Sequence, residues 1–445
     1  MGVLDPRELV VHNQDVGKLI RPAYSRERID EVADLLRRRG TLAFPTLPSG
    51  LFAAAAVDSE HYTGYGNVWV RDTVHIAHAL WRQGQIDTAV NAVNGLMRHF
   101  RRQRDRFREV IEAPERAADP MRRPHIRFDG MAETDVTEPW AHAQNDSLGY
   151  FLWLYSKLAV NRLISVDAEA WRTLALFPPY LRAIQFWSDE DSGHWEEGRK
   201  VEASSIGAVC AGLKALGELV HRARLPEEVR RADIAGQATD LLDRGTKQLH
   251  AILPWECREQ ETAKKRRYDS ALLFLVFPLR IVADRAAAMT IVGDVRDNLQ
   301  GRYGIKRYLG DSFWCTDYRK RVGAADRTKD YSKDMVSRDR YWRPDSEAQW
   351  CLFDPILSVI YGDWFMELGR AEMLELQAFH LNRSLGQITG TGERHAPFKC
   401  PELYHLEGAE VEPSDAVPLL WTQANLLLAL EAMRRSLEDR KEKFE

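Results

Sequence analysis

The 445-residue sequence has few cysteines and no long apolar run, and its charges nearly balance. Its five cysteines are scattered, with no CxxC spacing and an odd count, which is typical of reduced thiols and not of a disulfide framework or zinc site. A net charge of -4 gives no reason to expect a nucleic-acid partner. No stretch approaches the roughly 20 apolar residues that span a bilayer, and the N-terminus lacks a basic-then-apolar signal. We therefore expect a cytoplasmic protein with no membrane or nucleic-acid partner and leave its oligomeric state open.

Metal-ligand and strand patterns are equally scarce. His142 has no second histidine or cysteine at metal spacing, so we predict no metal and no cofactor and expect a structural histidine there. Only the stretch 305–313 has the pattern of a strand in a hairpin.

Helical periodicity, by contrast, covers most of the chain. We predict helices over 26–39, 72–83, 86–111, 146–162, 167–187, 202–223, 226–251, 269–281, 285–299, 347–362, 366–385 and 418–436. Pro178-Pro179 should kink or split the fifth of these.

The links between these helices alternate between short and long. Short links join antiparallel neighbours, so all the long links must lie at one end of the bundle. Six helical hairpins arranged in this way predict an all-α fold, an (α/α)6 barrel, as a single domain over 25–437. An N-terminal extension (1–24) precedes it, and a charged C-terminal tail (438–445) follows. Because loops carry chemistry, the mouth formed by the long links is where we expect the site.

One long link contains an aromatic residue directly before two adjacent carboxylates, Trp195 before Glu196 and Glu197. Repulsion between the acids and desolvation by the tryptophan both raise the pKa of one carboxyl group. A carboxylic acid that keeps its proton can protonate a glycosidic oxygen as the bond breaks. The alternative is a solvated turn with two surface glutamates.

Two further links begin helices with polar groups suited to a sugar. Arg71 beside Asp72 offers a planar donor fork and an acceptor pair that match adjacent hydroxyls, although an N-capping Asp with a structural Arg is the alternative. Trp140 could stack on a sugar ring while Gln144 and Asp146 bind hydroxyls; here the alternative is a helix cap with Trp140 in the core. In the last long link, Glu402 is our candidate for a second catalytic carboxylate.

Together these motifs resemble glycoside hydrolase family 15, the glucoamylases and their relatives, from about residue 42 to the last helix. The Trp-Val-Arg-Asp stretch 69–72 is similar to the family's substrate-binding motif, and 144–146 to the segment before its fourth helix. The Trp-Glu-Glu stretch looks like its general-acid motif, which implies that Glu196 is the acid and Glu197 contacts substrate. The general base in the hydrolases lies near the start of the last long link, where Glu402 falls. The implied fold agrees with the helix pattern.

Within the same clan, the sequence is also similar to the hydrolase-like domain of the phosphorylase kinase α and β subunits. The stretches 301–304, 347–350 and 401–404 look especially like those subunits, and Leu403 follows the base position as it does in them. Against that, the chain keeps Glu197 where those subunits carry an arginine.

The resemblance implies an inverting hydrolase that releases glucose from the non-reducing end of an α-glucoside, with Glu196 as acid and Glu402 as base. The chain has no room for the β-sandwich or starch-binding modules of many relatives, which favours short, soluble substrates. The side chains that we predict to bind the sugar are Tyr65, Trp69, Arg71, Asp72, Trp140, Gln144, Asp146, Trp195, Glu197, and Arg302 or Arg307. One alternative is a regulatory protein that binds carbohydrate without turnover, and another is a scaffold with an exposed apolar patch and no polar pocket.

Overall fold

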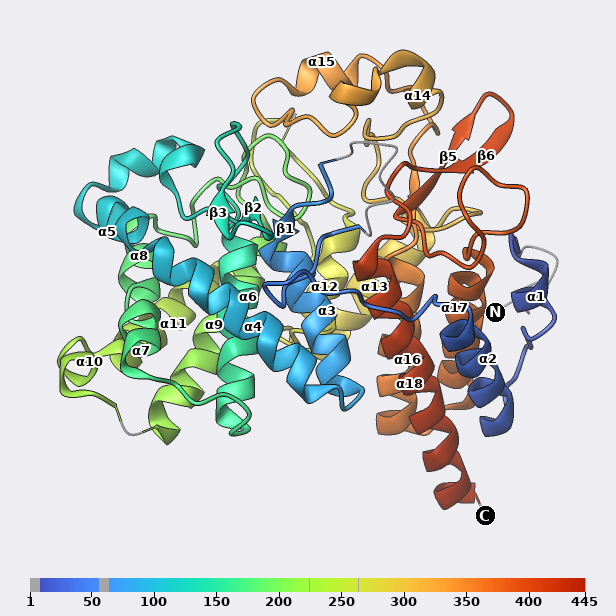
Figure 1. The fold of residues 1–445 in the computed structure, drawn as a ribbon, viewed down its shortest axis with the longest axis horizontal. Helices are drawn as coiled ribbons and strands as arrows, with labels where there is room; N and C mark the ends of the chain where they lie inside the picture. Colours follow the sequence, from blue (N-terminus) through green and yellow to red (C-terminus); the bar gives the residue numbers. More distant parts are fainter. Residues whose placement is uncertain (1–8, 56–63, 224, 263, 445) are drawn as a thin grey trace.

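The computed structural model describes residues 9–55, 64–223, 225–262 and 264–444. Its core is a closed inner ring of helices, and Figure 1 shows this ring from the side. Each inner helix contacts the next, and the last contacts the first. In chain order they are α3 (Val70–Arg82), α6 (Asn145–Val160), α9 (Ala203–Arg222), α12 (Leu273–Val276), α16 (Phe353–Leu368) and α18 (Leu420–Phe444).

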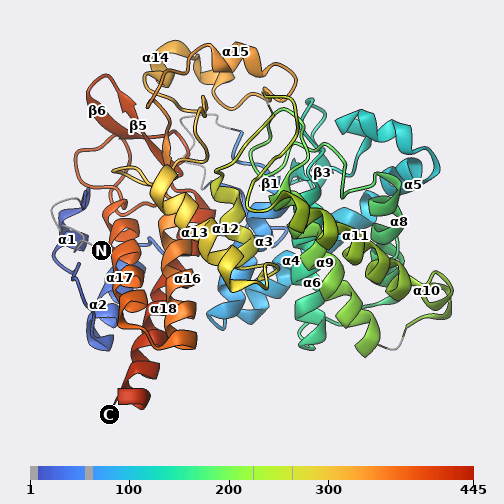
Figure 2. The ribbon, with the colours of Figure 1, turned by 180° about the vertical axis from the view of Figure 1, so that it is seen from behind.

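A second layer of helices surrounds the ring. Against the inner helices pack α4 (Ile86–Arg102), α11 (Ile234–Ile252), α13 (Arg285–Leu299), α17 (Ala371–Gly386) and α2 (Arg26–Arg38), while α7 (Ala168–Leu174) and α8 (Phe177–Ala183) lie between α4 and α11. The pair formed by α2 and α18 joins the two ends of the chain, as seen from behind in Figure 2. The fold is therefore the predicted all-α (α/α)6 barrel.

The distribution of apolar residues around each helix explains whether it lies in the inner ring or in the outer layer. Nearly every residue of α6 is buried, whereas α2 and α4 bury only one face. A helix apolar on all sides must lie inside, and an amphipathic one covers it. Among the described helices, α9 alone is long and apolar enough to cross a membrane by composition, and 83% of that stretch is buried inside the ring.

Several predicted helices are divided or shifted. The predicted helix 86–111 breaks at Gln103 into α4 and α5 (Arg104–Glu112), so that Phe107 packs on rings of α8. The stretch 167–187 splits as expected, with both prolines in the first turn of α8, where their missing N–H groups cost nothing. The stretch 226–251 forms α10 (Glu227–Arg231) and α11, and 269–281 forms a 3-10 turn (Ser270–Leu272) followed by the short α12.

The C-terminal end of the chain differs from the predicted helix 418–436. The last helix continues through Phe444, so most of the predicted tail is helical. The described part of the N-terminal extension holds α1 (Gln14–Gly17) and packs on the barrel, where His12 stacks on Tyr404 with ring centres 4.2 Å apart. All five cysteines are buried and free. The cytoplasmic location stays a prediction.

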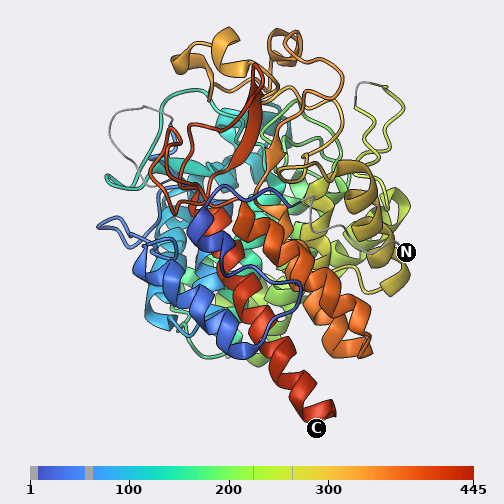
Figure 3. The ribbon, with the colours of Figure 1, turned by 90° about the vertical axis from the view of Figure 1, so that its right-hand side faces the viewer.

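The long connections gather at one end of the barrel, the upper end in Figures 1 and 3. They form two small sheets: β1 (Val68–Trp69), β2 (Arg127–Asp129) and β3 (Thr134–Asp135), and β4 (Gln349–Trp350), β5 (Leu403–Glu407) and β6 (Glu410–Pro413). Two short helices, α14 (Tyr318–Arg321) and α15 (Met335–Asp339), lie above them.

One strand prediction and one helix start were wrong in this region. The stretch 305–313 forms only isolated bridges, and the helix predicted from 347 begins at Phe353 because residues 349–350 pair with β5 instead. These sheets place two residues of the mouth: Trp69 lies opposite Arg127, and Glu402 directly precedes β5.

Candidate active site

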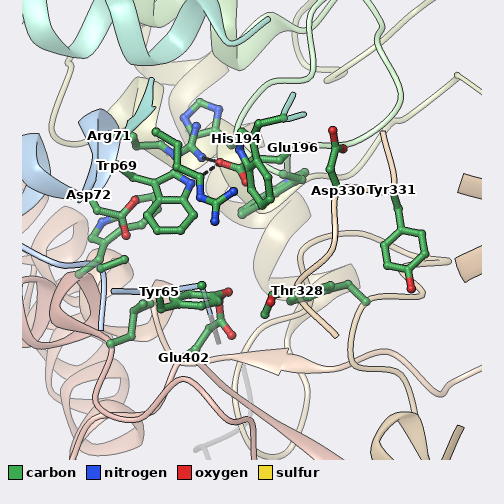
Figure 4. Close-up of a pocket in the computed structure, with 18 of the residues that line it drawn as sticks. Tyr65, Trp69, Arg71, Asp72, His194, Glu196, Thr328, Asp330, Tyr331 and Glu402 are labelled. Carbon is green, nitrogen blue, oxygen red and sulfur yellow. Dashed lines mark hydrogen bonds and ion pairs between the residues drawn. The ribbon is translucent and has the colours of Figure 1, made fainter. Parts of the chain in front are cut away.

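A pocket opens at the mouth of the barrel, with about 860 Å³ of space between its walls, open mouth included. Aromatic and charged side chains line it (Figure 4). Of the predicted site residues, nine line it: Tyr65, Trp69, Arg71, Asp72, Trp140, Trp195, Glu196, Arg307 and Glu402.

Glu196 reaches the pocket from an unusual backbone conformation. Its φ of 57° lies in the left-handed region, which non-glycine residues seldom adopt and which turns its side chain away from that of its neighbour. The carboxylate accepts hydrogen bonds from Trp69 Nε1 (2.8 Å) and Arg71 Nη2 (3.3 Å). Burial raises the pKa of Glu196, and the positive charge of Arg71 opposes that rise. The group is therefore poised to hold its proton at higher pH than an exposed glutamate.

Glu402 is held where β5 begins. Its backbone carbonyl accepts a hydrogen bond from the Cys351 N–H, and its side chain is almost completely buried. The Tyr65 hydroxyl donates to Oε1 at 2.7 Å and the Ser414 hydroxyl to Oε2 at 3.3 Å. Burial raises the pKa of Glu402 to about 7, although both hydrogen bonds favour the ionised form. A carboxylate with such a pKa is matched to proton transfer near neutral pH.

Arg71 and Asp72 come from the first turn of α3. Asp72 faces the pocket, and burial raises its pKa to about 7. The guanidinium of Arg71 donates to Asp146 Oδ2 at 2.6 Å and to Gln144 Oε1 at 3.0 Å. Gln144 and Asp146 do not line the pocket. They orient Arg71 from behind, and their predicted contacts with a sugar stay a prediction.

Glu197 also lies outside the pocket. Its carboxylate is enclosed by Arg338 (2.6 Å), Arg307 (2.9 Å) and the Tyr308 hydroxyl (2.7 Å), with Arg266 at 3.3 Å. Burial alone would raise its pKa, but the surrounding arginines hold the pKa of Glu197 well below its usual range. Glu197 is thus buried, ionised at neutral pH and held by these donors, and the substrate contact that the family resemblance implied stays a prediction.

Trp195 and Arg307 support each other on one wall. Trp195 Nε1 donates to Asp269 Oδ1 at 3.0 Å, which fixes the ring. The Arg307 guanidinium lies 5.1 Å from the centre of that ring and pairs with Asp311. These contacts hold the Trp-Glu-Glu segment on both sides of the strained Glu196.

Arg302, the last predicted residue, lies elsewhere. It borders a separate small cavity beside Val10, His12 and Arg383, where the N-terminal extension meets α17. The alternative that the sequence left open, Arg307, is the arginine that lines the pocket.

Several pocket residues had no clear sequence signal. Arg127 enters from β2 and stacks on Trp140, its guanidinium carbon 3.9 Å from the ring centre. The pairing of β1 with β2 could have suggested it only if those two short strands had been recognised. Trp350 belongs to the stretch 347–350, whose similarity to the phosphorylase kinase subunits the sequence had already indicated. The other lining residues not predicted are Ala54, Gly64, His194, Phe313, Thr328, Lys329, Asp330, Tyr331, Arg338, Leu419 and Trp421.

Two carboxyl groups with raised pKa values in an aromatic-lined pocket at the mouth of an (α/α)6 barrel define a carbohydrate-processing class of protein. The family model of the glycosyl hydrolases family 15 matches residues 38–342, and the chain belongs to that family.

Its curated relatives include a regulatory subunit and a glycoside hydrolase. The chain is 25% identical over 295 residues to the probable phosphorylase b kinase regulatory subunit alpha of Drosophila melanogaster, which is 60% of this chain and 22% of that protein. It is 27% identical over 274 residues to the isomaltose glucohydrolase of Kribbella flavida, which is 60% of this chain and 66% of that protein. The chain thus spans less than a quarter of the Drosophila subunit.

Solved structures share the fold. A glycosidase in complex with glucose superposes with a TM-score of 0.63 at 20% identity, covering 97% of this chain and 99% of that one. The glucoamylase from Saccharomycopsis fibuligera gives a TM-score of 0.59 at 11% identity, covering 98% of this chain and 99% of that one.

Proposed function

We propose that this protein hydrolyses short α-glucosides from the non-reducing end, releasing glucose with inversion. The observation that carries the proposal is that Glu196 and Glu402 lie on opposite sides of one pocket, one half-buried and the other buried, and each with a raised pKa (Figure 4). Glu196 would protonate the departing oxygen, while Glu402 would take a proton from the attacking water. Inversion needs the two carboxyl groups roughly 6.5–9.5 Å apart, which leaves room for that water.

The other pocket residues suit a terminal glucose. The Arg71 fork and the Asp72 carboxyl offer donors and acceptors for adjacent hydroxyls at the inner end of the pocket. Tyr65 and Trp140 supply flat apolar faces for the sugar ring. Buried polar groups of this kind reject sugars that leave them unpaired, which favours selectivity for one sugar.

The stereochemistry of the product tests the proposal directly. We expect glucose release from at least one of maltose, isomaltose and trehalose, with the β-anomer appearing first when the reaction is followed by NMR. Initial release of the α-anomer would refute inversion. Such an outcome would require Glu402 to act as a nucleophile instead of a base.

The second candidate is a regulatory protein that binds sugar without turnover. The similarity to phosphorylase b kinase regulatory subunits and the Leu403 that follows Glu402 favour it. Calorimetric binding of glucose or a disaccharide, with no glucose released from the panel, would support this candidate over hydrolysis.

A further inference from the structure

The turn that carries Glu196 is anchored to the barrel by the side chain of His194. The Glu197 N–H donates to the Ser192 carbonyl at 3.2 Å, which closes the turn, and Glu196 adopts its left-handed backbone inside it. His194 is 4% exposed and lines the pocket on the same side as Glu196 (Figure 4). Burial lowers the pKa of His194 to about 4, so near neutral pH its ring is neutral and has one N–H and one acceptor nitrogen.

Both ring nitrogens of His194 have a partner on an inner helix. Nε2 lies 2.9 Å from the Tyr150 hydroxyl of α6, and Nδ1 lies 3.1 Å from the Ser204 hydroxyl of α9. A hydroxyl can donate or accept, so both nitrogens are satisfied in either tautomer of the ring. The ring also stacks on Phe274 of α12, with ring centres 5.3 Å apart and planes 11° apart. Three consecutive helices of the inner ring therefore fix the plane of the imidazole.

A buried carboxyl group that the proposed mechanism does not use completes this anchor. The Ser204 hydroxyl donates to Glu256 Oε1 at 2.5 Å, and the Ser204 N–H donates to Oε2 at 3.2 Å. The Glu256 carbonyl accepts from the Ala203 N–H at 2.8 Å. Glu256 is thus bound to the first turn of α9 through side chain and backbone, and it holds the Ser204 hydroxyl in place beside His194.

The two helices that hold His194 keep a fixed separation. α6 and α9 pack so closely at Gly149 that a Cβ atom there would lie 2.4 Å from the carbonyl carbon of Ala208. Interiors packed at this density transmit a displacement and do not absorb it. The hydroxyls of Tyr150 and Ser204 therefore form a rigid frame around His194, two residues before Glu196.

A left-handed backbone at a glutamate persists only where its surroundings enforce it. We propose that His194 is a positioning residue that holds Glu196 in its place at the pocket. Tyr150 and Ser204 act through the His194 ring, and Glu256 acts through Ser204. The inference rests on the proposed function and deepens it, because it assigns the groups that place the acid.

Two variants that remove one hydroxyl each test the anchor without emptying the core: Tyr150→Phe and Ser204→Ala. A displaced acid fails substrates whose leaving group needs a proton, whereas α-glucosyl fluoride carries the same glucose with a leaving group that needs none. Each variant should lower kcat for a disaccharide about tenfold, a part of the about 10²–10⁴ that a positioned acid contributes, and leave kcat for the fluoride nearly unchanged. His194→Ala, which removes both bonds, should show the same selectivity with a larger loss.

The matched controls lie on the same two helices. Tyr155 of α6 and Ser205 of α9 are buried, and neither is among the described residues that line the pocket or bond to His194. Tyr155→Phe and Ser205→Ala should leave kcat for both substrates nearly unchanged. Equal losses on the disaccharide and the fluoride in the test variants would overturn the inference, because His194 would then act on the whole pocket. Unchanged rates on both substrates would overturn it as well.

A second measurement does not depend on turnover. In protein labelled with ¹³C at the glutamate carboxyl groups, the NMR signal of Glu196 is the one that Glu196→Gln lacks. Because burial raises the pKa of Glu196, a carboxyl group released from its place should titrate closer to the ordinary value in Ser204→Ala. Arg71, Arg127 and Asp72 also act on Glu196 and are the same in wild type and variant. If the wild type hydrolyses neither substrate, the proposed function has failed and this titration alone decides the inference; an unchanged pKa would refute it.

Discussion

The Tyr65 hydroxyl donates a 2.7 Å hydrogen bond to Oε1 of Glu402, the proposed base. This bond favours the ionised carboxylate, whereas burial favours the protonated form and raises the pKa of Glu402 to about 7. The balance between the two sets the pH at which Glu402 can accept a proton from water.

Removing that hydroxyl should move the pH profile. In Tyr65→Phe the pKa of Glu402 rises further, so the acidic limb of kcat/KM shifts to higher pH, and the loss of activity is largest below pH 7. A pH–rate profile on any disaccharide that is hydrolysed measures this. Tyr24→Phe is the control, because that hydroxyl bonds to Asn382 far from the pocket. An unshifted acidic limb would remove Tyr65 from this role.

Two substrates with different leaving groups distinguish the proposed acid, Glu196, from the proposed base, Glu402. Glu196→Gln and Glu402→Gln should each lower kcat on a disaccharide by about 10²–10⁴, the usual contribution of a positioned acid or base. Fluoride leaves without needing a proton, so Glu196→Gln should retain most activity on α-glucosyl fluoride and Glu402→Gln should not. Near-UV circular dichroism checks the fold, and Glu115→Gln, an exposed glutamate, serves as control. Equal behaviour of the two variants on the fluoride would contradict the assigned roles.

Burial of Glu402 should lower the free energy of unfolding at high pH. Its folded pKa of about 7 exceeds the ordinary value of 4.5, so the folded state holds the proton more tightly and loses stability as pH rises between those values. The cost at pH 8 is on the order of 3 kcal/mol at most. Glu402→Gln should therefore be more stable than wild type at pH 8 and about equal near pH 4.5. Urea unfolding at both pH values measures this, and a difference independent of pH would be evidence against it.

The ion pair between Arg71 and Asp146 behind the pocket should contribute to the stability of the fold. Arg71 and Asp146 are both almost fully buried, with side-chain exposures of 4% and 0%. Arg71→Met leaves the Asp146 charge unpaired and should lower the free energy of unfolding by about 3–5 kcal/mol. Arg37→Met, which breaks an exposed pair with Asp34, should cost only about 0–1 kcal/mol. Urea unfolding measures both variants. Similar losses of unfolding free energy would show that other groups compensate the Asp146 charge when Arg71 is removed.

Sequence alone predicted the helical hairpins and the barrel, because apolar periodicity and short links are local properties. It missed the breaks in several helices. The turn at Gln103, for example, depends on what Phe107 packs against, and that partner is more than 60 residues away.

The sequence by itself determined which segments hold the candidate catalytic residues, since the Trp-Glu-Glu stretch and Glu402 stand in motifs that resemble a known family. Only the tertiary structure decided between neighbours of the same chemical type. Glu196 and Glu197 are identical as side chains; the left-handed backbone at Glu196 and the arginines around Glu197 turn one into the pocket and bury the other. Residues 328–331 lie in an irregular segment and Arg338 on the short helix α15, neither of which shows an apolar period, and long-range ion pairs place them at the pocket.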